Sequence, residues 1–187
     1  MCRTRTRHKA EIWLFVYSTS PSAADAPAER LEADPATAWH MAQALVGAES
    51  LGAVERALEA SVAYAKERLT FGRAIGSYQA VKHELVEVLR RLENARSLMY
   101  YAGWAADDVP AEFPLAAGAF RLVAGEALDH ASRTQISVHG GIGATWEHDA
   151  PLYFRRAQLS RRLLGRTDDA ADRVADELFA EALSRAA

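Results

Sequence analysis

Long stretches of this chain carry an apolar side chain at every third or fourth position. Leu51, Val54, Leu58 and Val62 form one such series, and Asp34-Pro35 precedes it with a capping side chain and a proline suited to a first helical turn. Strand-like alternation of apolar and polar residues does not occur after residue 30. The periodicity predicts helices over residues 35–68, 77–107, 114–138, 150–164 and 167–184.

The breaks between these runs are short, as at Gly76-Ser77, Asp108-Val109-Pro110 and Gly140-Gly141. Long helices joined by short connections favour antiparallel neighbours. We therefore expect an all-α fold, an antiparallel four-helix bundle with an additional C-terminal helix. Residues 29–187 are expected to form this single helical domain, and residues 1–28 a flexible arm or the remnant of something upstream.

Composition narrows the class of protein further. Half of the 187 residues are hydrophobic and a quarter are charged, which is enough to bury a core. The formal net charge of -3 gives no general attraction to nucleic acid or to an anionic membrane. Cys2 is the single cysteine, which suits a reducing cytoplasm, and no window approaches the roughly 18 apolar residues of a membrane span.

The residue types that usually perform chemistry are not arranged in a recognisable site. The six histidines are scattered, without the spacing of metal ligands on one helical face. No serine has a recognisable nucleophile motif around it, and Cys2 is an improbable nucleophile. We expect no metal site.

Two segments leave a structural and a functional interpretation open. Gly140 and Gly141 can simply end a helix, or they can let the backbone approach a phosphate. Arg68 can complement the dipole of the helix that it ends, or bind an anion. Phe71 can belong to the core or stack on a flat ring, and Gln79 can be solvated or contact a ligand.

Taken together, these segments resemble the C-terminal helical domain of acyl-CoA dehydrogenases. The resemblance rests on RLTFGRAIGSYQAVKH, followed about 55 residues later by HGGIGATWEHDAPLYFRRA, and it covers about residues 29–165. The family pattern is Arg-x-x-Phe-Gly-x-x-Ile-x-x-Phe/Tyr-Gln-x-x-x-His, then Gln-x-His-Gly-Gly-x-Gly-Phe-Thr-x-Glu. The N-terminal helical domain and the middle β domain of that family have no counterpart in the 28 residues that come first.

The resemblance implies an FAD-dependent oxidoreductase of fatty acid metabolism. These enzymes dehydrogenate the α and β carbons of an acyl-CoA thioester and pass the electrons to an electron-transfer flavoprotein. Part of the FAD is held by the C-terminal domain of the neighbouring subunit, so the resemblance also implies an oligomer. The implied cofactor-binding residues are Arg68, Thr70, Phe71, Gln79, Gly140 and Gly141.

The chain departs from the family pattern at several positions. Ser137 replaces the family glutamine before the glycine pair, and Ala144 replaces a phenylalanine. The catalytic base of one branch of the family would fall at Leu164, and that of another branch near Ala42, but neither is a carboxylate. Glu147, an acid in the glycine-rich loop beside Trp146, is the other candidate for the base, and Glu49 and Glu55 lie further along the first helix. The family counterpart of Glu147 is normally structural, so the catalytic base is unassigned.

Three hypotheses remain open on the sequence alone. The first is a subunit or fragment of an acyl-CoA dehydrogenase that works with a fuller chain, as in some bacterial family members that act on steroid side chains. The second is a non-catalytic helical oligomerisation module. The third is a truncated, inactive product of a dehydrogenase gene.

Overall fold

The computed structural model describes residues 34–165 and 167–186. The predicted arm at residues 1–28 lies outside them. The helices are α1 (Pro35–Glu67), α2 (Gln79–Asp108), α3 (Phe113–His139), α4 (Ala150–Ser160) and α5 (Thr167–Ala186). The connections contain a hairpin of β1 (Leu69–Thr70) and β2 (Arg73–Ala74) and two short 3-10 helices, η2 (Ile75–Ser77) and η3 (Gly140–Ala144).

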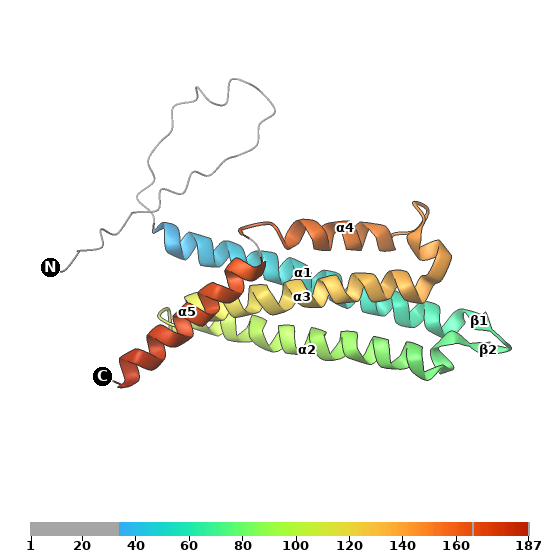
Figure 1. Ribbon diagram of the computed structural model, residues 1–187, viewed down its shortest axis with the longest axis horizontal. Coiled ribbons are helices and arrows are strands. Elements are labelled where there is room, and N and C mark those ends of the chain that lie inside the picture. Colours follow the sequence, from blue (N-terminus) through green and yellow to red (C-terminus); the bar gives the residue numbers. More distant parts are fainter. Residues whose placement is uncertain (1–33, 166, 187) are drawn as a thin grey trace, which may run out of the picture.

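The first four helices form an up-down-up-down bundle (Figure 1). α1 and α3 run in one direction and α2 and α4 in the other, while α5 leans across the end of the bundle opposite the hairpin. α3 is the central helix, because α1, α2, α4 and α5 all pack against it. The predicted four-helix bundle with an additional helix is confirmed.

Two details differ from the sequence-based expectation. A two-stranded hairpin, with Leu69 paired to Ala74 and Thr70 to Arg73, occupies a segment where only a turn was expected. The fourth helix ends at Ser160 instead of near residue 164. Each difference is a local event of a few residues, below the length that periodicity can detect.

A buried arginine explains the early end of α4. Arg121 of α3 is 6% exposed, and its guanidinium donates hydrogen bonds to the carbonyl oxygens of Ser160 and Leu163. Leu164 and Gly165 then take left-handed φ values of 59° and 97°. The carbonyl group of the last residue of α4 and one in the turn after it thus accept from a side chain of another helix, and the chain turns away toward α5.

The core consists largely of alanines along α3 and the faces of α1 and α2 that meet it. Small residues let the helices approach closely, and Phe120 and Leu128 supply the large buried side chains. None of the helices in the described part of the chain is long and apolar enough to cross a membrane.

Candidate functional site

The hairpin presents an aromatic side chain at its tip. Phe71 and Gly72 form the two-residue turn with φ values of 54° and 79°, and positive φ at both positions is the type I′ geometry that matches strand twist. The Tyr78 hydroxyl donates a hydrogen bond to the Thr70 carbonyl oxygen at 3.0 Å, and the Arg73 guanidinium lies 4.1 Å from the Tyr78 ring centroid. These contacts hold the hairpin against the start of α2 and leave Phe71 93% exposed.

The glycine-rich loop begins where α3 ends. Gly140 is the C-cap, with φ 64° and ψ -139°, and its N–H bonds to the carbonyl oxygens of Ile136 and Ser137. Helix termination, one of the two interpretations of this glycine, is therefore correct. A Cβ at Gly140 or Gly141 would meet nothing within 4 Å, so the backbone at both positions is open to an approaching group.

A groove of about 710 Å³ lies between the hairpin, the start of α2 and the last turns of α3. The hairpin and the residues before α2 contribute Thr70, Phe71, Ile75 and Tyr78, and α2 contributes Ala80, Val81 and Glu84. The residues from α3 are His130, Arg133, Thr134, Ser137 and Val138. A groove of this size with aromatic and apolar walls and a few hydroxyl groups suits a flat organic ligand.

The structure brings the six predicted cofactor residues to one end of the bundle. Thr70 and Phe71 line the groove, whereas the others lie exposed at the hairpin end of the bundle without lining it: Arg68, Gln79, Gly140 and Gly141. Arg68 forms no ion pair with any residue that the structure describes. The positive charge of Arg68 is therefore available to a ligand.

Several residues of the groove were not predicted as ligand contacts. Tyr78 and Ser137 belong to the two family motifs, but neither was predicted to contact the cofactor. Arg133 and His130 lie one and two turns before Ser137 on the same helix, and only the packing of α2 against α3 places them in the groove. Arg133 is also bonded to Asp129 at 3.0 Å.

A stack of three rings supports the glycine-rich loop. The His139 ring lies 4.4 Å from the Tyr64 ring and 4.3 Å from the His148 ring, between centroids. His139 Nδ1 is 2.8 Å from the Gln135 carbonyl oxygen, and His148 Nδ1 accepts from the Ala150 N–H. Burial lowers the pKa of His139 below its ordinary value of 6.5, and the neighbouring His148 contributes in the same direction.

This stack predicts a loss of stability in mildly acidic solution. Because the pKa of His139 is lower in the folded chain, the unfolded chain takes up the proton first, and the free energy of unfolding falls as the pH drops below about 6.5. Burial lowers the pKa of His40 too, so His139→Gln is expected to reduce the pH dependence without abolishing it. Urea unfolding at pH 7.5 and 5.5 measures the effect, and an unchanged dependence in the variant would contradict it.

Three acids were considered for the catalytic base, and none of them lies where a base could act in the groove. Glu49 is bonded to Arg156 of α4, and Glu55 to Arg96 of α2 at 2.9 Å. Glu147 is exposed in the loop. The geometry gives none of them a buried position in the groove.

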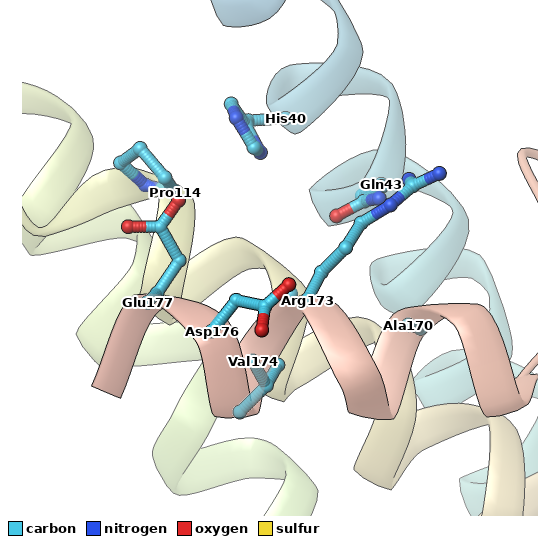
Figure 2. Close-up of a pocket in the computed structure, with 9 residues that line it drawn as sticks. His40, Gln43, Pro114, Ala170, Arg173, Val174, Asp176 and Glu177 are labelled. Carbon is cyan, nitrogen blue, oxygen red and sulfur yellow. The ribbon is translucent and has the colours of Figure 1, made fainter. Parts of the chain in front are cut away.

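A second, smaller pocket lies at the opposite end of the bundle. Its volume is about 160 Å³, and it is formed where α5 crosses α1 and α3. Figure 2 shows Arg173 of α5 beside Gln43 of α1, and Glu177 of α5 beside Pro114 of α3. This pocket holds none of the predicted cofactor residues.

No cluster of three metal-ligating side chains occurs within residues 34–165 and 167–186. The ring stack contains only two histidines, and both Nδ1 atoms are in hydrogen-bonding contact with the backbone.

The fold is that of the helical domain of a known enzyme family. The family model "Acyl-CoA dehydrogenase, C-terminal domain" matches residues 36–179. The chain belongs to the acyl-CoA dehydrogenase family, and the match is to its C-terminal domain.

Individual relatives agree with this assignment. The acyl-CoA dehydrogenase IpdE2 of Mycobacterium tuberculosis is 42% identical over 151 residues, which are 81% of this chain and 45% of that protein. The structure of the ChsE4-ChsE5 complex from the same species has a TM-score of 0.70 and 28% identity, covering 75% of this chain and 38% of that one. The Tcur3481-Tcur3483 steroid acyl-CoA dehydrogenase (G363A variant) has a TM-score of 0.73 and 28% identity, covering 77% of this chain and 40% of that one.

The chain spans less than half the length of the curated IpdE2 proteins that it matches.

Proposed function

We propose that this chain is a subunit of an FAD-dependent acyl-CoA dehydrogenase and works with a fuller chain of the same family. Its role is to contribute FAD contacts and oligomer surface to α,β-dehydrogenation of an acyl-CoA thioester. The observation that carries the proposal is the groove at the hairpin end, together with Arg68 at the same end of the bundle, which has no counter-ion among the described residues.

The residues at this end fit a dinucleotide. Phe71 and Tyr78 offer rings for stacking on a flat heterocycle, and the Thr70 and Ser137 hydroxyls offer hydrogen bonds. Arg68 supplies the charge that a pyrophosphate requires. A bound FAD would supply the acceptor for the hydride removed from the β carbon.

In this proposal Gly140 and Gly141 do not form a cradle of N–H groups around an anion, and their role is more limited. The N–H of Gly140 is already bonded to the end of α3, so this group is not a free phosphate donor. Gly140 and Gly141 instead leave space beside the backbone, and a side chain at either position would occupy space that the cofactor needs. Gln79 is exposed at the start of α2 and is a further contact in the proposal.

The catalytic base comes from the partner chain in this proposal. Leu164 and Ala42 stand where the two branches of the family have theirs, and a hydrocarbon cannot accept the α proton. The two solved structures described above are each named for a pair of chains, which supports a two-chain assembly. An electron-transfer flavoprotein is the proposed electron acceptor, and the cytoplasm is the proposed compartment.

Co-expression with the second dehydrogenase chain of the genomic neighbourhood tests the proposal. We expect a yellow complex with a flavin absorbance band and little flavin on this chain alone. Arg68→Gln should weaken FAD retention by the complex about 10- to 100-fold, since a charge-assisted hydrogen bond is lost. Flavin released on dialysis gives the measurement.

Arg56→Gln is the matched control, because Arg56 is an exposed arginine of the same helix already bonded to Glu59. It should leave flavin retention unchanged. A stable two-chain complex without flavin would favour the non-catalytic module, and failure to form any complex would favour the truncated product.

A further inference from the structure

The small pocket where α5 crosses α1 and α3 is lined by two polar side chains of α1 with unused hydrogen-bonding capacity. Gln43 is 3% exposed, and its amide bonds to no residue within 34–165 and 167–186. About one turn earlier, His40 Nδ1 is buried and has no hydrogen-bond partner in the same part of the chain. A buried polar group without a partner costs stability, so both groups stand ready for a ligand in the pocket.

Opposite charges lie on different sides of this pocket. Arg173 and Glu177 are four residues apart on α5, a spacing at which such residues commonly pair, yet the described chain shows no ion pair between them. The Arg173 guanidinium lies 5.1 Å from the ring centroid of Trp39 of α1, whereas the Glu177 carboxylate lies beside Pro114 of α3 (Figure 2). Asp176 also lines the pocket and adds a second carboxylate.

The pocket has room for a small molecule only. Its volume of about 160 Å³ corresponds to about five water molecules, or to a ligand of about five to seven non-hydrogen atoms. Gly118 of α3 helps to keep this space open, because a Cβ at that position would lie 3.2 Å from Val174 Cγ2 and 3.9 Å from Gln43 Oε1.

We propose that this pocket binds a small zwitterion, an amino acid with a short aliphatic chain. The carboxylate of the ligand accepts from the Arg173 guanidinium and from the Gln43 amide N–H. Its ammonium group donates to the Glu177 carboxylate and to His40 Nδ1. The ligand thus uses both unpartnered groups of α1 and both charges of α5.

His40 is suited to the acceptor role. Burial lowers its pKa below the ordinary value of 6.5, so the imidazole is neutral at pH 7.5 and Nδ1 can accept when the proton is on Nε2. The charges of Glu177 and Arg173 both act on this ring, in opposite directions, which places it near both.

A ligand with a single charge matches the pocket less well. A lone carboxylate would be repelled by Asp176 and Glu177, and a lone ammonium group would be repelled by Arg173. With so few atoms in contact, we expect a dissociation constant on the order of 1 mM for the zwitterion. The pocket lies at the opposite end of the bundle from the cofactor groove, so binding should not require flavin or a fuller chain.

Nuclear magnetic resonance titration of the full chain at pH 7.5 tests the proposal. The probes are glycine, β-alanine and 4-aminobutyrate, and acetate and methylammonium at equal ionic strength are the single-charge controls. We expect at least one zwitterion to cause saturable shifts of the Gln43 side-chain amide and the Trp39 indole N–H. Acetate and methylammonium should bind at least about tenfold more weakly.

Three substitutions locate the binding groups. Arg173→Gln and Glu177→Gln should each weaken binding about tenfold, since each removes a charge-assisted hydrogen bond. Gln43→Leu should weaken it as much and also raise the melting temperature by about 2–4 °C, because an apolar group of similar size replaces an unpartnered amide. Asp172→Asn is the matched control, a carboxylate lost from an exposed position of α5 that does not line the pocket.

Four results would overturn the proposal. They are no saturable shift with any zwitterion up to about 50 mM, equal binding of a single-charge probe, unchanged affinity in the Arg173, Glu177 or Gln43 variants, and an equal loss in Asp172→Asn. A Gln43→Leu variant less stable than the parent also contradicts it, because the amide would then be satisfied within the fold.

Discussion

Phe120→Ala is expected to lower the free energy of unfolding by about 3–5 kcal/mol, the usual cost of removing a buried aromatic ring. Phe120 is 1% exposed in the N-terminal third of α3. Its ring fills the space beside Gly47 of α1, where a Cβ atom would come within 2.8 Å of the ring. Urea unfolding at neutral pH measures the loss, and Phe179→Ala on the exposed face of α5 should stay within about 0.5 kcal/mol of the parent.

Gly47→Ala, made in the parent and in the Phe120→Ala background, distinguishes the specific contact between Gly47 and the Phe120 ring from a general loss of buried apolar contacts. In the parent, Gly47→Ala forces the new methyl group against Phe120, at a cost of about 1–3 kcal/mol that the higher helix propensity of alanine partly offsets. In the Phe120→Ala background the ring is absent, so Gly47→Ala should recover about 1 kcal/mol. Additive losses in the double variant would show that α1 and α3 do not meet as described.

The helices were predictable because each is long enough for its periodicity to be unmistakable. α1 begins at Pro35, next to the predicted cap Asp34, whose carboxylate accepts from the N–H groups of Ala36 and Thr37. α4 was predicted too long because Leu163 and Leu164 continue the apolar pattern. The group that ends this helix, the Arg121 guanidinium, lies about 40 residues earlier in the sequence and carries no local signal.

Only part of the site was predictable, because the sequence reveals only those site residues that lie close together in it. Arg68, Thr70 and Phe71 are close together in the sequence, so one motif reveals them all. His130 and Thr134 reach the groove only because the end of α3 lies beside the hairpin and the start of α2. The ring stack of Tyr64, His139 and His148 likewise joins the ends of three separate segments, and no spacing rule anticipates it.

Gly143→Ala is expected to destabilise the chain although alanine favours a helical turn. A Cβ at Gly143 would lie 2.7 Å from the Ile136 carbonyl oxygen and 2.8 Å from the His139 Cβ. Backbone cannot yield as a flexible side chain does, so η3 must move off the end of α3, at a cost of about 1–3 kcal/mol. For a chain of this size the melting temperature should fall by about 3–10 °C.

Gly52→Ala is the matched control, since a Cβ at that position in α1 meets nothing within 4 Å and should stabilise the helix by up to about 1 kcal/mol. The same chemical change thus has opposite signs at the two positions. In the two-chain complex, Gly143→Ala should also reduce flavin retention at least tenfold, because Gly140 and Gly141 belong to the same displaced turn. Lower stability with normal flavin retention would separate the loop from the cofactor, leaving Arg68, Thr70 and Phe71 to carry the contact.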